Sequence, residues 1–440
     1  MKFRGLIAAA IVLLALAGTL YWSERHEAKK ALETPTISTP AILRLDPSTI
    51  TALDVKQKGA QGIQLVRSGA QWQITAPNTY PADAGAVSNM LTTLSPLNAQ
   101  SIVEDHASNL TEFGLSDPAV EIDVTTKDSK TSRLLLGDDP PTGDGVYVAV
   151  AGDSRVFVAS SFVKTSLNKG LSDLRDKRLL PVDASSVSSI ELIRKGDDIT
   201  FARIQNGWQI EKPKTYRSDN FQVDDLLQQL TTAKWDGSAP SADTVKTFAH
   251  AAPVASVKLT GSFGNDTLEV RKDKEDYYAR SSVVAGVWKV DSTASSTLGQ
   301  AMDHSLDDFR NKQIFAFGDS DPEKIECHSG ATNFVLTHNN NAWWSNGQKM
   351  DTVSVESLIA ALRELSASKF VDSGFTTPLI EITVTSDGSK RIEKVQIQKT
   401  GDSGIAKLEG DSSLYALDAT TINSLTNAIA GLKPASQARK

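Results

Sequence analysis

The sequence predicts an α+β protein of three tandem homologous domains, each a mostly antiparallel sheet with packed helices, after one N-terminal transmembrane helix. Three observations indicate this. A stretch that runs from a tryptophan into a helix occurs three times, and a second string recurs at the same spacing. Between these landmarks, short runs of alternating apolar residues are bounded by glycine, proline and aspartate, as antiparallel strands are.

The first recurring stretch is WQITAPNTYPADAGAVSNMLTTL at residues 72–94. Its counterparts are WQIEKPKTYRSDNFQVDDLLQQL at 208–230 and WSNGQKMDTVSVESLIAALREL at 344–365. The aligned tryptophans, Trp72, Trp208 and Trp344, lie 136 residues apart. Each stretch is typical of a strand end, a turn and a helix, and the third copy lacks the proline of the first two.

An aspartate precedes each predicted helix, at Asp83, Asp219 and Asp351. Aspartate is a favoured N-cap residue, because its carboxylate accepts hydrogen bonds from the free amides of the first turn. In the first copy Val87, Met90, Leu91 and Leu94 then fall on one helix face. We therefore interpret the aspartates as caps and the tryptophans as core anchors, in preference to catalytic or ligand-binding groups.

The second recurring string marks the start of each copy, at residues 42–55, 179–192 and 314–327. The spacings of 137 and 135 residues are too long for a solenoid repeat and suit whole domains. The sequence thus predicts domains at 42–178, 179–313 and 314–432, followed by a frayed tail at 433–440.

A third marker, F-G-L-x-x-P or a worn version of it, follows each helix. We treat all of these recurring residues as structural anchors of the repeat. They are Trp72, Pro77, Asp83, Gly114, Pro118, Trp208, Pro213, Asp219, Pro253, Trp344, Asp351 and Pro378.

The first two copies close on similar strings, LSDLRDKRLL at 171–180 and LDDFRNKQIF at 306–315. Arg175 and Arg310 occupy the same place in these strings. The simplest interpretation is a basic helix C-terminus that interacts with the helix dipole. A partner-binding patch is the alternative.

The N-terminal region predicts export. Residues 1–5 carry two basic residues and are expected in the cytoplasm. Residues 6–22 contain no charged residue and span roughly 25 Å as a helix, the short end of a membrane crossing. Residues 23–41 form a polar, Pro/Thr-rich linker. A cleaved signal peptide, with Ala15-Leu16-Ala17 as its cleavage site, is the alternative, and it also exports the rest of the chain.

Composition narrows the class of protein. A net charge of −7 argues against a nucleic-acid partner, because such proteins carry a basic stripe. Cys327 is the only cysteine, so no intramolecular disulfide forms and no multi-cysteine zinc site is expected. We expect no metal and no cofactor. The sequence also lacks the G-x-S-x-G and G-x-x-x-x-G-K-[ST] motifs of hydrolases and nucleotide-binding proteins.

The markers together resemble the domain-of-unknown-function 4340 family. The residues that carry the resemblance are Trp72, Pro77, Asp83, Phe113, Gly114, Leu115, Pro118, Gly137 and Tyr147. The resemblance covers most of residues 42–319 and fades in the third copy. It implies an exported protein anchored in the bacterial inner membrane, with its bulk in the periplasm. Genes of this family often lie beside those of ABC-type export or gliding-motility complexes.

Three functions follow as hypotheses. The preferred one is a non-catalytic accessory subunit of an ABC-type envelope transport system, with the permease as partner. The second is an envelope module that binds a polysaccharide or peptide, and it predicts exposed Trp235, Trp288 or Trp343 in one cleft. The third is a hydrolase, which requires a pocket with a strongly shifted carboxylate or histidine.

Overall fold

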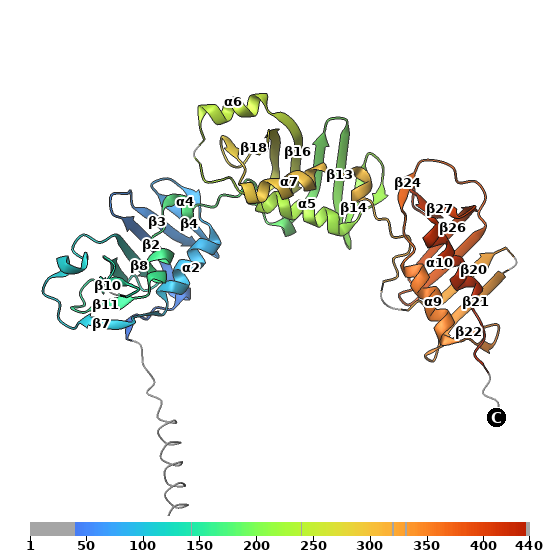
Figure 1. Cartoon of the computed structure of the whole chain (residues 1–440), viewed down its shortest axis with the longest axis horizontal. Coiled ribbons are helices and arrows are strands. Elements are labelled where there is room, and N and C mark those ends of the chain that lie inside the picture. Colours follow the sequence, from blue (N-terminus) through green and yellow to red (C-terminus); the bar gives the residue numbers. More distant parts are fainter. Residues whose placement is uncertain (1–39, 142, 239, 319–320, 331, 437–440) are drawn as a thin grey trace, which may run out of the picture. The chain divides into compact units, whose positions relative to one another are not determined.

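The computed structural model describes residues 40–141, 143–238, 240–318, 321–330 and 332–436. It divides into two compact units between Asp176 and Lys177. Both consist mostly of antiparallel sheet with packed helices, as predicted (Figure 1). The predicted transmembrane segment, residues 6–22, lies outside the described residues. Within the described ranges no helix has the length and apolar character that a membrane crossing needs.

The first unit contains a nine-stranded sheet in the order β5-β4-β3-β2-β8-β9-β10-β11-β7 and a two-stranded sheet, β1-β6. The large sheet comprises β5 (Tyr80–Pro81), β4 (Gln71–Ala76), β3 (Ile63–Ser68), β2 (Ile50–Gln57), β8 (Val120–Thr126), β9 (Thr131–Leu136), β10 (Val146–Val150), β11 (Val156–Ala159) and β7 (Ser101–Glu104). The remaining elements are β1 (Ala41–Leu43), β6 (Leu97–Asn98), α2 (Ala84–Leu94), α3 (Ser161–Leu167), α4 (Leu171–Leu174) and the 3-10 helices η1 (Pro47–Thr49) and η2 (Leu110–Phe113).

The second unit contains two large sheets. The first of them has the order β15-β14-β13-β12-β16-β17-β18-β19. Its strands are β15 (Tyr216–Arg217), β14 (Gly207–Lys212), β13 (Asp197–Ile204), β12 (Val187–Arg194), β16 (Ala252–Gly261), β17 (Gly264–Asp273), β18 (Asp276–Ser281) and β19 (Val287–Lys289). Its helices are η3 (Ala184–Ser186), α5 (Asn220–Thr232), α6 (Ala242–His250), α7 (Ser292–Asp303) and α8 (Leu306–Phe309).

The other large sheet of this unit has the order β23-β22-β21-β20-β25-β26-β27-β28-β24. Its strands are β23 (Gln348–Lys349), β22 (Ala342–Ser345), β21 (Thr332–Asn339), β20 (Lys324–Ser329), β25 (Ile380–Ser386), β26 (Arg391–Thr400), β27 (Ser403–Leu408), β28 (Leu414–Leu417) and β24 (Lys369–Val371). Two helices accompany it, α9 (Thr352–Arg363) and α10 (Ala419–Ala430).

All three large sheets share one order over eight strands, to which the first and third add a ninth, and each draws its strands from one contiguous stretch of the chain. Four strands run outward to one edge, and a helix (α2, α5 or α9) follows the fourth. The chain then returns to the centre of the sheet, where the next main strand pairs with the first, as β8 pairs with β2. The next three strands run to the opposite edge, where β7 and β24, which precede the central strand in the chain, complete the first and third sheets. The chain must cross one sheet face between the fourth and fifth strands, so helices cover that face.

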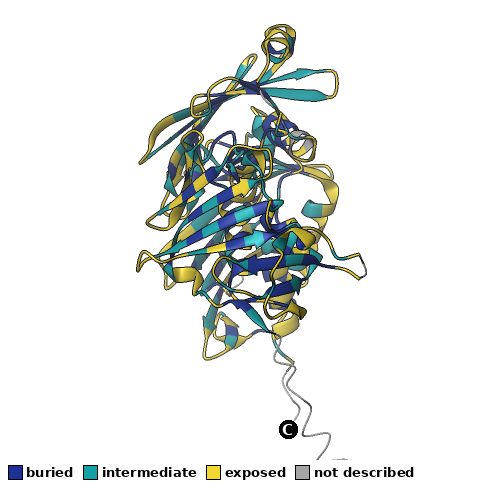
Figure 2. Ribbon diagram, turned by 90° about the vertical axis from the view of Figure 1, so that its left-hand side faces the viewer, coloured by how far each residue is buried: buried dark blue, intermediate teal, exposed yellow. Residues whose placement is uncertain are grey.

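The strands alternate between buried and more exposed residues, as a sheet covered on one face requires (Figure 2). In β8 the buried residues are Val120, Ile122 and Val124. The intervening residues carry charges that pair across strands, as in the Arg133–Asp123 ion pair at 2.7 Å. The corresponding face of the next sheet has the Lys258–Glu191 pair at 3.0 Å. The open faces are thus polar, and their charges are paired internally.

A pair of backbone hydrogen bonds, which we call the clasp, joins the start of the first helix to the chain after the last helix. In the first sheet the Asp83 amide donates to the Leu174 carbonyl (2.8 Å), and the Asp176 amide donates to the Pro81 carbonyl (2.9 Å). In the second sheet the Asp219 amide donates to the Phe309 carbonyl, and the Asn311 amide donates to the Arg217 carbonyl. In the third sheet the Asp351 amide donates to the Lys433 carbonyl, and the Ala435 amide donates to the Lys349 carbonyl.

Arg175 and Arg310 are the C-caps of α4 and α8, so basic residues lie at these helix ends as predicted, although each helix has only four residues. Their guanidinium groups also lie 4.0 Å from the ring centres of Tyr80 and Tyr216, and that of Arg310 is 3.6 Å from the Phe370 ring centre. The clasp corrects one prediction, because the predicted frayed tail is wrong at its start. Lys433 and Ala435 form the third clasp, which sequence patterns did not indicate because only backbone groups take part.

The third recurring tryptophan is Trp343 and not Trp344. Trp343 is 4% exposed, whereas Trp344 is 38% exposed. Trp343 lies opposite His338, just as Trp72 and Trp208 lie opposite arginines on the preceding strand. Its carbonyl accepts the Met350 amide, as the Trp72 carbonyl accepts the Ala82 amide. Neighbouring residues of a strand face opposite sides of the sheet. An alignment that is wrong by one residue therefore assigns the buried position to a solvent-exposed tryptophan.

These adjacent tryptophans offer a matched test. Trp343→Ala removes a buried ring and should lower the free energy of unfolding by about 3–5 kcal/mol. Trp344→Ala removes an exposed ring from the same strand and should cost at most about 1 kcal/mol. Urea denaturation of the full chain, followed by far-UV circular dichroism, measures both. Equal losses for the two variants would contradict the assignment of Trp343 as the core residue.

Candidate functional site

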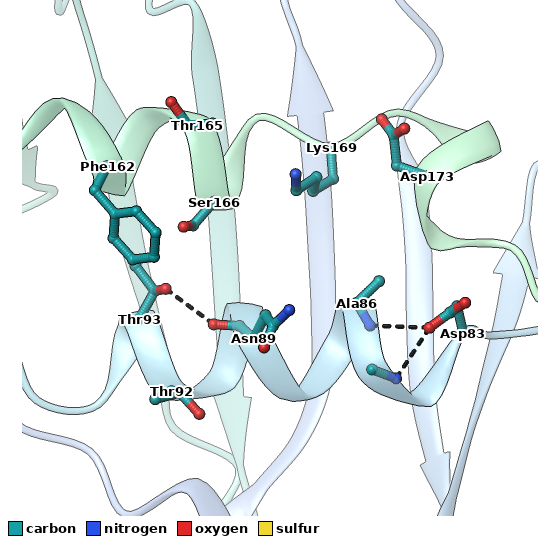
Figure 3. A pocket seen from close by; sticks show the side chains of 11 residues that line it. Asp83, Ala86, Asn89, Thr92, Thr93, Phe162, Thr165, Ser166, Lys169 and Asp173 are labelled. Atoms are coloured by element: carbon teal, nitrogen blue, oxygen red, sulfur yellow. Dashed lines mark hydrogen bonds between the residues drawn. The ribbon is translucent and has the colours of Figure 1, made fainter. Parts of the chain in front are cut away.

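A polar groove between α2 and the α3–α4 segment is the best-formed candidate site in the first unit (Figure 3). Its volume is about 740 Å³, within the range of ligand sites. It is lined by Asp83, Gly85, Ala86, Asn89, Thr92, Thr93, Phe162, Thr165, Ser166, Lys169 and Asp173.

The groove is polar because the apolar stripes of both helices face the sheet. Val87, Met90 and Leu94 of α2 are buried, and so are Val163 and Leu167 of α3. The opposite helix faces, rich in threonine, serine and asparagine, line the space between the helices. Both threonines of α2 donate to carbonyls one turn earlier, Thr92 to Ser88 and Thr93 to Asn89, each at 2.9 Å. Their hydroxyl oxygens remain available as acceptors.

One end of the groove carries the charged residues. Asp83 caps α2, because its Oδ1 accepts from the Gly85 and Ala86 amides at 3.0 Å. Asp173 Oδ2 likewise accepts from the Gly170 amide at 2.9 Å. Lys169 lies on the α3–α4 side of the groove, half-buried, and no described residue forms an ion pair with its ammonium group. The carboxylates are thus engaged by backbone amides, while the lysine retains its donors.

Two further residues shape the middle and the far end. Ser166 is 7% exposed, and its hydroxyl points between the helices without a hydrogen-bond partner among the described residues. Phe162 is 66% exposed, and its ring projects over the end of α2 beside Thr93 (Figure 3). Sequence patterns did not single out these residues or Lys169. Whether the Phe162 ring is exposed, and whether the Ser166 hydroxyl finds a hydrogen-bond partner, depends on which helix packs beside α3. Local sequence does not reveal that neighbour.

A similar groove of about 510 Å³ lies between α9 and α10 in the second unit. It too has the N-cap aspartate, Asp351, and a lysine just beyond the second helix, Lys433. Ser354, Ser357, Ser424 and Asn427 line it. The same helix arrangement thus produces a groove rich in hydroxyl groups in both units.

The recurring aspartates are N-caps in the structure. Asp83, Asp219 and Asp351 each accept hydrogen bonds from first-turn backbone amides. Trp208 is 3% exposed, and its Nε1 donates to Asp224 Oδ1 at 2.8 Å. Trp72 is half-buried and packs against the first core.

The recurring prolines and Gly114 lie at turns and strand starts. Pro77 and Pro213 follow cis peptide bonds in the turns after β4 and β14. Gly114 ends η2 in the left-handed region, with φ of 66°. Pro118 and Pro378 precede β8 and β25, while Pro253 lies within β16. These residues direct the chain between elements and do not converge on a site.

Two family markers that are distant in sequence meet in one small cluster. The rings of Phe113 and Tyr147 pack edge to face, with centroids 5.0 Å apart. Gly137 lies against this cluster, and a Cβ there would be 2.1 Å from the Phe113 carbonyl oxygen. Only glycine fits at that distance. The marker residues therefore support a loop connection and do not line the groove.

The aromatic residues that a ligand-binding cleft was expected to expose are buried. Trp235, Trp288 and Trp343 are 4%, 5% and 4% exposed. Trp235 and Trp288 pack against each other, with ring centroids 4.5 Å apart. These three tryptophans therefore do not form a binding surface.

Burial raises the pKa values of three groups in the third sheet, Cys327, Glu393 and Tyr415, and none of them lines either groove. Burial raises the pKa of Cys327 to about 12, so the thiol is protonated and unreactive at neutral pH. His328, its neighbour on β20, is exposed on the other side of the strand. Burial also raises the pKa of Glu393, whose carboxylate accepts from the Ala316 amide at 2.9 Å. That contact fastens the chain before β20 to β26.

Comparison with known families gives two matches to one model, described as a domain of unknown function (DUF4340), at residues 72–211 and 208–380. Together they span more than half of the 440 residues, and the chain belongs to this family. The resemblance drawn from the marker residues is confirmed. The matches begin at Trp72 in β4 and at Trp208 in β14, the corresponding strands of successive sheets. Searches of curated proteins and of solved structures gave no match.

The Glu393 contact predicts a pH-dependent stability. Because burial raises its pKa in the folded state, the folded chain holds this proton more tightly than the unfolded chain. The resulting stabilisation is complete below the ordinary pKa of 4.5 and is lost as the pH rises through the folded-state value. Relative to Glu393→Gln, the wild type should therefore lose stability as the pH rises above the ordinary pKa of 4.5.

Urea midpoints of both proteins below and above that pKa measure the effect. Glu409→Gln, which changes an exposed glutamate in the turn after β27, serves as the control and should track the wild type. A constant difference between wild type and Glu393→Gln, or one that changes in the opposite direction, would contradict the assignment.

Proposed function

We propose that this protein is a non-catalytic, membrane-anchored interaction subunit of an ABC-type envelope transport system. In this proposal residues 6–22 anchor the chain in the bacterial inner membrane, and three tandem copies of one domain extend into the periplasm. The shared strand order of the three large sheets and the repeated clasp support the three-domain organisation.

The single observation that carries the non-catalytic assignment is the use made of the groove's carboxylates. Asp83 and Asp173 both bind backbone amides. The lining residues include neither histidine nor cysteine. General acid–base or nucleophilic chemistry needs a nucleophile within hydrogen-bond reach of a base. The arrangement instead offers hydroxyl, amide and ammonium groups on a rigid helix pair, which suits binding.

The transport role rests on the family resemblance and the predicted anchor. A periplasmic interaction subunit needs folded domains of fixed shape. Ion pairs within the open sheet faces, such as Arg133–Asp123 and Lys258–Glu191, keep these faces from adhering to one another. The hydrolase hypothesis receives less support. The groups whose pKa values burial raises are Cys327, Glu393 and Tyr415, which belong to the third sheet and do not line the described grooves.

Affinity purification of the tagged full chain after mild detergent extraction and cross-linking tests the transport role. We expect an ABC-type permease to co-purify, because the subunit would contact it at the membrane. The matched control fuses residues 1–41 to an unrelated folded domain, which shows whether the anchor alone captures the permease. Recovery of the chain without any permease, or equal recovery with the control, would count against the proposal.

A further inference from the structure

We propose that the groove between α2 and α3 binds an acidic oligosaccharide, with a sugar carboxylate at Lys169 and a sugar ring on Phe162. The site goes beyond the proposed transport role and needs no transport partner. Its ligand would be a carboxylate-bearing glycan of the envelope, so it shares with that role only the exported location of the chain.

Polar groups that face the groove indicate a polar ligand. Ser166 is 7% exposed, and its hydroxyl faces the groove and makes no hydrogen bond to a described residue. A ligand hydroxyl placed there would form a hydrogen bond with it. Asn89, opposite it on α2, makes no side-chain hydrogen bond to a described residue and offers both donors and an acceptor.

The aromatic and the cation define the class of ligand. The Phe162 ring is exposed on a helix, where an apolar side chain gains nothing from the fold. The C–H face of a pyranose ring carries slight positive charge and stacks on the negative face of an aromatic ring. Lys169 supplies a half-buried ammonium group without an ion-pair partner among the described residues, and a carboxylate is its natural counter-ion.

The dimensions suit a short oligosaccharide. From Asp83 to Thr93 the groove follows α2 for roughly 15 Å, at 1.5 Å per residue, which is about the length of three sugar units. Phe162 and Lys169 lie seven positions apart, so the stacked ring and the carboxylate belong to different sugars. A peptide fits less well, because peptides are mostly held through free backbone amides and carbonyls. Here the groups that face the groove belong to side chains.

The groove in the second unit supports the same chemistry. Ser357, Ser424 and Asn427 supply hydroxyl and amide groups there, and Lys433 lies at the corresponding end. Its exposed apolar residue is Val353 instead of an aromatic ring. We infer that it binds the same class of ligand more weakly, because a valine offers no ring for stacking.

Titration of the full chain in detergent with trigalacturonate, followed by saturation-transfer NMR and calorimetry, tests the site. The neutral trisaccharide galactotriose is the matched ligand, and hexaglutamate is the peptide probe of similar charge. We expect trigalacturonate to bind with a Kd of about 1 mM or below, and at least about tenfold more tightly than either of the other two. No binding up to about 10 mM, or equal binding of hexaglutamate, would overturn the proposal.

Variants assign the contacts. Phe162→Ala should weaken both trisaccharides at least about fivefold, whereas Lys169→Met should abolish the preference for trigalacturonate over galactotriose. Phe221→Ala removes an equally exposed phenylalanine outside the groove, 75% exposed on α5, and should leave binding unchanged. Because Phe162 and Phe221 are exposed, both variants should unfold at the wild-type temperature. Loss of binding in Phe221→Ala, or unchanged binding in Phe162→Ala, would contradict the assigned site.

Discussion

The clasp is the constraint on which each module depends. Two backbone hydrogen bonds join the residues on either side of a helix start to the chain that follows the last helix. Each such bond contributes only about 1 kcal/mol net. Their effect on geometry is larger, because they hold the N-cap aspartate, the turn before it and the last helix in one arrangement. They also use backbone atoms alone. This explains why the third clasp forms around Lys433 and Ala435, in a segment that resembles neither of the other two.

The helix layer above each sheet follows from that arrangement. Once the clasp places the N-cap of α2 beside α4, the apolar residues of α2 and α3 face the sheet and their polar residues face each other. A groove between two such helices is therefore polar by construction. What distinguishes the first groove is the aromatic ring of Phe162, which together with Ser166 and Lys169 is not required by the clasp or the caps. In the interaction subunit that we propose, these residues add a binding surface to a fold whose other recurring residues are structural.

For the recurring aspartates, only the three-dimensional structure distinguishes a structural role from a catalytic one. In the sequence, a carboxylate that recurs three times at similar spacing resembles a catalytic residue. In the structure its oxygens accept from the amides of the first helical turn. The structure likewise decides which of the tryptophans belong to the core. Trp208 and Trp343 are buried against their cores, while the adjacent Trp344, which differs from Trp343 by one position, faces solvent.

Much of the fold was predictable because its causes are local. Period-two alternation predicted antiparallel strands between the recurring landmarks, and the structure has such strands there, among them β2 and β8. The aspartate before an apolar stripe located α2, α5 and α9. Each of these signals depends on residues within a few positions of one another. The family markers were equally visible, because the close approach of Gly137 to Phe113 admits only glycine.

Other features were decided by the tertiary structure alone. The arginines of the recurring strings stack on tyrosines some 95 residues away, a contact that spacing along the chain does not encode. The alignment of two adjacent tryptophans depended on which face of β22 meets the core. The polar groove exists only because separate helices lie side by side. The sequence by itself thus determined the main strands, the repeat and the helix caps, through local periodicity and spacing. The clasp, the buried tryptophan and the groove depended on which distant segments came into contact.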